Sequence, residues 1–418
     1  MQTNPDKTID SLKDTYKDVF PIVGVGAGIA SILGKNGSEF ISQQYNAVTP
    51  GNEMKPDAIL GSTIGKLVKT TDEVSADKTD FITVEDAKSM GYIIPDNYTS
   101  YDDNRFKSAT GEYAVPRLNF DNVDKLMKAA HENGVKLRGH TLVWHQQTPK
   151  YFFQQNYKIT TGQKYNTSKE CMDTRLEFYV KTVMNHVLSS EYADCLYSYD
   201  VVNEYLHSAN AEKDSKNITY WGLIYGTYDK SVKDHGVTLR PSYVKDAFKY
   251  AHEMLVKYDR LDVKLIYNDY NCYQNPENII HLVDYINSDG KVCDGIGMQS
   301  HLDITDSFHS ATNYAKALEY FRLNCPDLEI QITELDATMV STEDKPLTDE
   351  DQAAYYDQIM NAILTNKKNG GNITALIIWS LYDGVSWRPA KFPCLFNGLY
   401  MPKAAFYAVI DAKKQYWD

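Results

Sequence analysis

Eight short runs of apolar and β-branched residues recur along the chain, separated by stretches with helical spacing. In one such stretch, residues 242–259, Val244, Phe248, Ala251 and Leu255 share one face of a predicted helix. Eight alternating strand–helix units predict an α/β fold of the (β/α)8 TIM barrel type, because an open doubly wound sheet usually has about five or six strands. The predicted strands span residues 22–30, 45–55, 135–145, 197–206, 263–271, 295–304, 329–337 and 374–383.

Polar and aromatic residues gather at the C-terminal ends of these predicted strands. The active sites of such barrels lie at that end, so this polarity predicts a site built from several strand ends. The residues concerned are Asn203–Glu204, Asn268–Asp269, Gln299–His301, Glu334–Asp336 and Trp379.

Residues 57–115 interrupt the alternation of strands and helices with a polar segment rich in Asp, Thr, Ser and Lys. A plain loop between strand and helix usually has about 2–6 residues, so we interpret this segment as an insertion after the second strand. Residues 1–418 are then expected to form one catalytic domain that carries this insertion.

Composition narrows the choice of partner. The formal net charge of −13 argues against nucleic acid or an anionic membrane surface. Most of the 32 Tyr and 5 Trp are expected in the core or on the surface, and a sugar-binding cleft would use a few of the rest, because ring faces stack on the apolar faces of sugars. No stretch approaches the ~20 apolar residues of a membrane span. The polar N-terminus lacks a signal peptide, so we expect either a cytoplasmic protein or a mature form whose leader was removed, and a monomer.

Two glutamates are placed for the hydrolysis of a glycosidic bond, a reaction that needs two carboxyl groups. Glu204 and Glu334 each follow a β-branched run and so should lie at the ends of the fourth and seventh predicted strands, which face each other across the barrel mouth. A single glutamate at a strand end is more often a partner in a salt bridge. Two of them, each with polar neighbours at strand spacing, favour catalysis.

Sites of other kinds have little support. The odd spacing of His140 and His145 puts them on opposite faces of a strand, which disfavours a metal site. The six cysteines form no C-x-x-C pair, and free thiols are expected. The segment GVGAGIA, residues 24–30, lacks the full glycine pattern of a dinucleotide loop and the acidic residue that should follow it. We therefore expect no metal and no cofactor.

Six sequence blocks in order resemble glycoside hydrolase family 10, the barrel-fold endo-β-1,4-xylanases. They are RGHTLVWH, DVVNE, YNDYN, GIGMQSHL, ITELD and DGVSWRP, and FNGLYMPKAAFYAVIDA also resembles the end of that family. The resemblance implies that Glu204 is the acid/base, Glu334 the nucleophile and Asn203 the partner of the sugar 2-hydroxyl. It further implies that His301 bonds to Glu334 and is held by Asp336. The matching positions that line the sugar-binding subsites are Asn52, Lys55, His140, Trp144, Gln299, Trp379 and Trp387, and His145 and Arg388 match the pattern as further substrate-binding positions.

The strand geometry agrees with these implied roles. Asp336 lies two residues beyond Glu334, so both side chains share a strand face. An imidazole between two carboxylates would orient the nucleophile and keep it ionised. Glu204 needs the opposite surroundings, which keep it protonated near neutral pH.

One position departs from the family pattern. Gly51 stands where the family usually carries a glutamate that contacts the glycone side of the substrate. We hypothesise that residues 57–115 rebuild that wall, with Tyr98, Tyr101 or Tyr113 as substitutes; the alternative is that the insertion packs away from the cleft.

The predicted function is endo-hydrolysis of β-1,4-xylosidic bonds in xylan or xylo-oligosaccharides with retention of configuration. One alternative is a related barrel hydrolase that acts on β-glucan or aryl-glycosides. Another is a non-catalytic xylan-binding protein, which the presence of both glutamates argues against.

Overall fold

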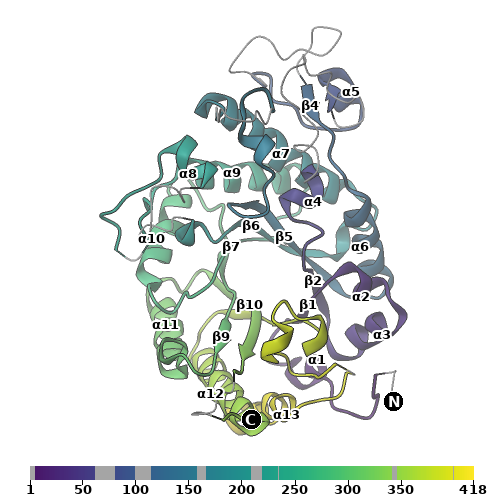
Figure 1. Ribbon diagram of the computed structural model, residues 1–418, viewed down its shortest axis with the longest axis vertical. Coiled ribbons are helices and arrows are strands. Elements are labelled where there is room, and N and C mark those ends of the chain that lie inside the picture. The colour runs from purple at the N-terminus through teal and green to yellow at the C-terminus, as the bar shows by residue number, and fades with distance from the viewer. Residues whose placement is uncertain are drawn as a thin grey trace.

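The computed structural model describes residues 5–61, 81–98, 114–157, 166–208, 219–233, 235–340, 346–398 and 400–418. Eight parallel strands pair in the order β1-β2-β5-β6-β7-β8-β10-β11, and β11 pairs again with β1, so the sheet closes into a barrel. This confirms the predicted (β/α)8 architecture and all eight predicted strands (Figure 1). The barrel strands are β1 (Ile22–Ala27), β2 (Ala47–Pro50), β5 (Lys136–Trp144), β6 (Leu196–Asn203), β7 (Lys264–Asp269), β8 (Gly295–Met298), β10 (Glu329–Thr338) and β11 (Ile373–Trp379).

Helices surround the barrel (Figure 1). Their apolar residues are buried, as in α6, α9 and α10. In α9 the predicted face is buried, and α12 begins with a capping box between Thr348 and Asp351. The longer helices are α3 (Lys35–Gln44), α6 (Asp121–Glu132), α7 (Lys169–Ser189), α9 (Ser242–Lys257), α10 (Pro276–Ile286), α11 (Ala311–Asn324), α12 (Asp349–Lys368) and α13 (Ala404–Ala412). The shorter elements are α1 (Leu12–Tyr16), α2 (Ile29–Leu33), α4 (Pro56–Leu60), α5 (Val84–Ser89), α8 (Tyr220–Tyr225), β3 (Phe81–Thr83), β4 (Ala114–Pro116) and β9 (His301–Asp303).

The described part of the insertion packs on the outer side of the barrel. Strand β3 pairs with β4, and both lie with α5 beyond α7, far from the barrel axis (Figure 1). The backbone N–H of Ile93 donates to Thr182 of α7 over 3.0 Å. Tyr98 is 5% exposed, its hydroxyl bonds to that of Tyr157 over 2.6 Å, and its ring packs on Phe178.

The suggestion that Tyr98 contacts sugar is therefore wrong, because its ring and its hydroxyl are both used in the core. Tyr101 and Tyr113 lie outside the described residues. No residue described between 57 and 116 lines the cleft, so this part of the insertion follows the alternative in which it packs away from the substrate.

A buried polar network fills the barrel beneath its mouth. The guanidinium of Arg138, fully buried, pairs with Asp200 and donates to Gln331. His140 bonds through Nδ1 to Asp200 over 2.9 Å. Because Asp200 serves both partners, the charge pair in the core also orients the imidazole that projects toward the site above.

Two further features concern the chain as a whole. All six cysteines are free thiols, and five of them are buried. Within the described ranges, the longest helices are too short or too polar to cross a lipid bilayer.

Candidate active site

A cleft of about 740 Å³ opens at the C-terminal ends of the barrel strands. Its lining comes from β1, β5, β6, β9, β10 and β11 and from the segments that follow β1, β2, β5, β6, β7, β8, β9 and β11. Most of the residues predicted from the sequence lie here: Asn52, Lys55, His140, Trp144, Asn203, Glu204, Gln299, His301, Glu334, Trp379, Trp387 and Arg388.

Glu204 directly follows β6 and turns its carboxyl group into this cleft. Its backbone has φ 58° and ψ 33°, a left-handed conformation that costs a residue other than glycine about 1–3 kcal/mol. Its N–H donates to the carbonyl of Asn268 over 2.8 Å, which holds the turn against β7. The carboxyl group accepts from Trp144 Nε1 over 2.9 Å and from Gln299 Nε2 over 2.8 Å. The carboxyl group is therefore fixed at both oxygens.

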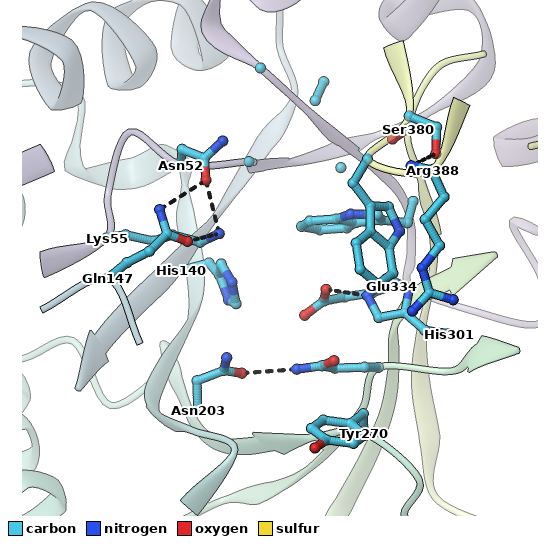
Figure 2. A pocket seen from close by; sticks show the side chains of 18 of the residues that line it. Asn52, Lys55, His140, Gln147, Asn203, Tyr270, His301, Glu334, Ser380 and Arg388 are labelled. Atoms are coloured by element: carbon cyan, nitrogen blue, oxygen red, sulfur yellow. Dashed lines mark hydrogen bonds and ion pairs between the residues drawn. The ribbon is translucent and has the colours of Figure 1, made fainter. Parts of the chain in front are cut away.

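Glu334 lies within β10, with its carboxylate held from two sides. His301 Nε2 bonds to Oε2 over 3.0 Å, and Asn268 Nδ2 donates to Oε1 over 2.8 Å. Behind the imidazole, Asp336 accepts from His301 Nδ1 over 2.8 Å and from Trp387 Nε1 over 2.8 Å. Figure 2 shows Glu334 and His301 side by side on one wall. The same carboxylate of Asp336 thus orients both a histidine and a tryptophan of the cleft.

A chain of amide hydrogen bonds connects the two glutamates. Asn203 Oδ1 accepts from Asn268 Nδ2 over 2.9 Å and from Gln299 Nε2 over 3.2 Å. Since Asn268 also contacts Glu334 and Gln299 also contacts Glu204, the relative position of the two carboxyl groups is set by three amide side chains. Such positioning is what a reaction shared between two carboxyl groups requires.

The two carboxyl groups have opposite electrostatic surroundings. Burial is the largest influence on the pKa of Glu204 and raises it, aided by the charges of Asp269 and Glu334 and opposed by the hydrogen bonds from Gln299 and Trp144. Burial also acts to raise the pKa of Glu334, but the His301 hydrogen bond and the positive charge of the neighbouring histidines outweigh it and bring that pKa to about 2.

The charge of His301 is consistent with this. Burial lowers the pKa of His301, but Asp336 and Glu334 overcome that effect and raise it to about 10. The imidazole is therefore positively charged at neutral pH. One carboxyl group of the cleft is thus favoured as an acid and the other as an anion, which is the division that acid-assisted nucleophilic substitution needs.

The opposite wall of the cleft carries a second polar cluster. Lys55 Nζ donates to Asn52 Oδ1 and to Gln147 Oε1, each over 3.0 Å, and lies 4.9 Å from the ring centre of Trp144. Figure 2 shows this group facing Glu334 and His301 across the cleft. Beside it, Gly51 leaves room for a side chain, since an added Cβ would meet only backbone atoms at 3.9 Å.

The close approach of the Trp379 ring explains the glycine at position 26 of the first strand. The ring of Trp379 lies directly on Gly26, where an added Cβ would come within 2.2 Å of the ring. A larger side chain at position 26 would push the tryptophan out of the cleft. Gly26, within the segment 24–30, therefore leaves the space that the ring of Trp379 occupies in the cleft wall.

Two predicted residues, His145 and Asp336, do not line the cleft, whereas Arg388 does. His145 does not line the cleft; burial lowers the pKa of its imidazole to about 4. Asp336 lies behind His301, fully buried. Arg388 lines the rim, with its guanidinium 3.8 Å from the ring centre of Trp387.

Sequence reasoning missed several residues that line the cleft or shape it. Asn268 and Tyr270 belong to the block YNDYN, so the strand-end position of Asn268 was visible but its contacts with both Asn203 and Glu334 were not. Gln147 and Ser380 had no signal, because they lie in irregular loops. Within the described residues, no group of three or more His, Cys, Asp or Glu side chains is placed to hold a metal ion.

Comparison with known proteins agrees with the geometry. The family model described as glycosyl hydrolase family 10 matches residues 11–412. The endo-1,4-beta-xylanase A of Butyrivibrio fibrisolvens is 40% identical over 373 residues, which are 89% of this chain and 77% of that protein. The bifunctional endo-1,4-beta-xylanase of Ruminococcus flavefaciens is 30% identical over 97% of this chain, but this chain spans only 34% of that protein.

Solved structures give the same result. A two-module fragment of the Clostridium thermocellum endo-1,4-beta-D-xylanase 10B, complexed with xylohexaose, superposes with a TM-score of 0.70 and 27% identity, covering 97% of this chain and 67% of that one. The intracellular xylanase of Thermoanaerobacterium saccharolyticum, solved as a mutant in complex with xylotriose, has a TM-score of 0.68 and 25% identity, covering 97% of this chain and all of that one. The chain therefore belongs to glycosyl hydrolase family 10.

Proposed function

We propose that this chain hydrolyses β-1,4-xylosidic bonds within xylan or xylo-oligosaccharides, with retention of configuration, using Glu204 as acid/base and Glu334 as nucleophile. The observation that carries the proposal is the opposite electrostatic state of two carboxyl groups held in one cleft. Family membership and the xylanase names of the relatives support the substrate.

The first step forms a covalent intermediate. A carboxylate oxygen of Glu334 attacks the anomeric carbon, the glycosidic C–O bond breaks, and the proton of Glu204 passes to the departing oxygen. Glu334 suits this role because the charge of His301 keeps it ionised. Glu204 suits its own role because burial raises its pKa and so favours the protonated form.

The second step releases the sugar. Once Glu334 is esterified it carries no charge, and one influence that raised the pKa of Glu204 is gone. Glu204, now ionised, takes a proton from water, whose oxygen attacks the anomeric carbon while Glu334 leaves as a carboxylate. In this proposal Asn203 hydrogen-bonds the sugar 2-hydroxyl, and the contacts of its Oδ1 with Asn268 and Gln299 support this role by holding its amide group.

The cleft suits a neutral polymer. Trp144, Trp379, Trp387 and Tyr270 offer aromatic surface to sugar rings, while Asn52 and Lys55 offer hydrogen bonds to their hydroxyl groups. Product analysis on xylan, xylotetraose and carboxymethyl-cellulose tests the substrate. Hydrolysis of the glucan and not of xylan would favour the β-glucan alternative, and the absence of any turnover would favour a binding protein.

Substitution of each glutamate tests the two roles. Glu204→Ala is expected to lose xylan cleavage but to retain the first step on an aryl xylobioside with a good leaving group, which departs without protonation, and azide should then rescue the second step. Glu334→Ala is expected to be inactive on both substrates. If the two variants behave alike on the activated substrate, the assigned roles are wrong.

A further inference from the structure

Next to Glu204 lies a second histidine–carboxylate pair that the mechanism above does not use. His207 is the last residue of the 3₁₀ helix Tyr205–His207, which begins directly after Glu204. Its Nδ1 bonds to Asp269 Oδ1 over 2.7 Å. Its ring stacks on Tyr270, with centroids 3.9 Å apart, and Tyr270 lines the cleft. The His207 side chain is 18% exposed, so its imidazole can exchange protons with solvent.

Asp269, the partner of His207, is fully buried at the end of β7 and neighbours Glu204. The backbone connects them, because Glu204 N bonds to the carbonyl of Asn268, and Gln299, which donates to Glu204, bonds through its own N–H to the carbonyl of Asp269. Asp269 accepts from the hydroxyl of Tyr267 and from Tyr270 N. A buried negative charge therefore lies beside the group that must gain and lose a proton.

The other titratable groups around His207 come from three further segments. His145 follows β5, and His235 lies in the segment before α9; the His235 ring is 5.3 Å from that of His207. Burial lowers the pKa of His145 to about 4, so it carries no charge at neutral pH. Lys55 approaches Glu204 from the opposite wall. Among these groups, His207 is the one that directly hydrogen-bonds Asp269.

We propose that His207 is a positioning residue for the acid/base: its imidazolium neutralises Asp269 and so sets how readily Glu204 releases and regains its proton. The proposal rests on the function proposed above. When Glu204 gives its proton to the leaving group, it becomes a second anion beside Asp269, and the proton on His207 compensates for that repulsion. When His207 is neutral, Asp269 is uncompensated and Glu204 holds its proton more tightly.

The directions of the pKa shifts of Glu204 and His207 agree with this geometry. The charge of Asp269 contributes to the raised pKa of Glu204. Burial lowers the pKa of His207, but the charge and hydrogen bond of Asp269, together with the charge of Glu204, raise it overall. Glu204 therefore responds to the charge of Asp269, and His207 responds to the charges of both carboxyl groups.

His207→Asn tests the proposal, because asparagine keeps an N–H donor for Asp269 and removes the charge. The basic limb of kcat/KM on xylotetraose, which follows the protonation of Glu204, should move upward by about one pH unit, the size of a neighbouring charge effect. The acidic limb of deglycosylation, measured with an activated aryl xylobioside, should move in the same direction, because that step needs ionised Glu204.

A matched control exists on the outer surface of the barrel. His186 of α7 also bonds to an aspartate, Asp124 over 2.6 Å, and stacks on an aromatic ring, Phe120 at 3.8 Å, but it does not line the cleft. His186→Asn should leave both limbs in place. If His207→Asn lowers kcat/KM equally at every pH, or if both variants move the limbs alike, the role is structural and the proposal is overturned.

Asp269→Asn completes the test. It should move the basic limb downward, and adding His207→Asn to it should then change the limb by less than about 0.3 pH unit, since the double-mutant cycle removes the shared interaction. Should Asp269→Asn prevent folding, His207→Gln provides a second charge-removing variant for the same profiles. A basic limb that persists in Glu204→Ala refutes the proposed function, whereas a limb that depends on Glu204 but not on His207 refutes this inference alone.

Discussion

Replacing His301 by asparagine removes the positive charge that holds the nucleophile ionised. His301 contacts Glu334 and Asp336 over 3.0 and 2.8 Å, and all three side chains are largely or fully buried. Asparagine is too short to bond to both carboxylates, so Glu334 is left with Asn268 as its direct donor. The substitution therefore tests whether the charge on the imidazole, rather than the shape of the cleft, produces the reactive carboxylate.

The expected size follows from the two pKa values. The pKa of Glu334 lies at about 2 instead of its ordinary 4.5, and the pKa of His301 at about 10 instead of 6.5. At about 1.4 kcal/mol per pKa unit these differences correspond to about 3 and about 5 kcal/mol. Both numbers describe largely the same interaction, so we expect one loss of about 3–5 kcal/mol, as for other broken buried ion pairs.

The two pKa values also determine the pH range in which this interaction stabilises the folded protein. Glu334 has a lowered pKa, so its contribution to folding is present above about pH 4.5 and is lost as the pH falls toward 2. His301 has a raised pKa, so its contribution is present below about pH 6.5 and is lost as the pH rises toward 10. The difference in free energy of unfolding between the parent protein and His301→Asn should therefore be largest between about pH 4.5 and 6.5.

Urea denaturation at pH 3 to 9 measures the stability difference, and the pH profile of kcat/KM on an activated aryl xylobioside measures the nucleophile. Because burial still acts on Glu334 after its partner is removed, the acidic limb should rise to pH 4.5 or above. Activity at its optimum should fall roughly 10- to 100-fold, as expected for a charge-assisted hydrogen bond of ~1.5–3 kcal/mol. An acidic limb that stays where it is in the parent protein would refute the reasoning, and His186→Asn is again the control.

Three further predictions concern other parts of the molecule. NMR of freshly released product should show the β-anomer first, since a retaining mechanism forms a glycosyl-enzyme on Glu334; an α-anomer would exclude that role. Lys403→Met should destabilise the protein by about 3–5 kcal/mol in thermal unfolding, because Lys403 and Asp383 form a buried pair at the loop that carries Trp387, and adding Asp383→Asn should restore part of the loss. Tyr98→Phe should lower the free energy of unfolding by about 1 kcal/mol through the lost hydrogen bond to Tyr157, and it should leave kcat/KM on xylotetraose within about twofold. A larger change in kcat/KM would indicate that the insertion contributes to the cleft after all.

The barrel could be predicted from the sequence because its signal repeats. Eight apolar runs separated by amphipathic helices leave few other architectures, and the carboxyl ends of parallel strands meet at one rim whatever the loops do. Glu204, Gln299 and His301 lie at or beside strand ends, so their approximate place followed from strand polarity alone, whereas Glu334 lies within β10. The sequence pattern was informative wherever position was set by the regular backbone.

The contacts that tune the site could not be predicted in the same way. Asn268 touches both Asn203 and Glu334 only because strands β6, β7 and β10 bring their ends together around the barrel. Glu204 adopts a left-handed backbone conformation, which local residue preferences do not predict. Tyr98 was misplaced because a tyrosine in a polar insertion fits a sugar contact and a buried core position equally well by pattern. These features depend on tertiary packing, which single-sequence patterns do not record.

Beside the effect of burial, the two histidine–aspartate pairs of the cleft differ in one respect that contributes to the opposite pKa shifts of the two glutamates. His301 stands between Asp336 and Glu334 and bonds directly to the glutamate, so its positive charge acts on Glu334 at hydrogen-bond distance and lowers the pKa of that group. At the other pair, His207 bonds to Asp269, and it is the negative member that contributes to raising the pKa of Glu204. A histidine next to the glutamate lowers the pKa of that glutamate, whereas an aspartate next to it raises the pKa. One kind of pair thus favours an anion at one wall of the cleft and a protonated acid at the other.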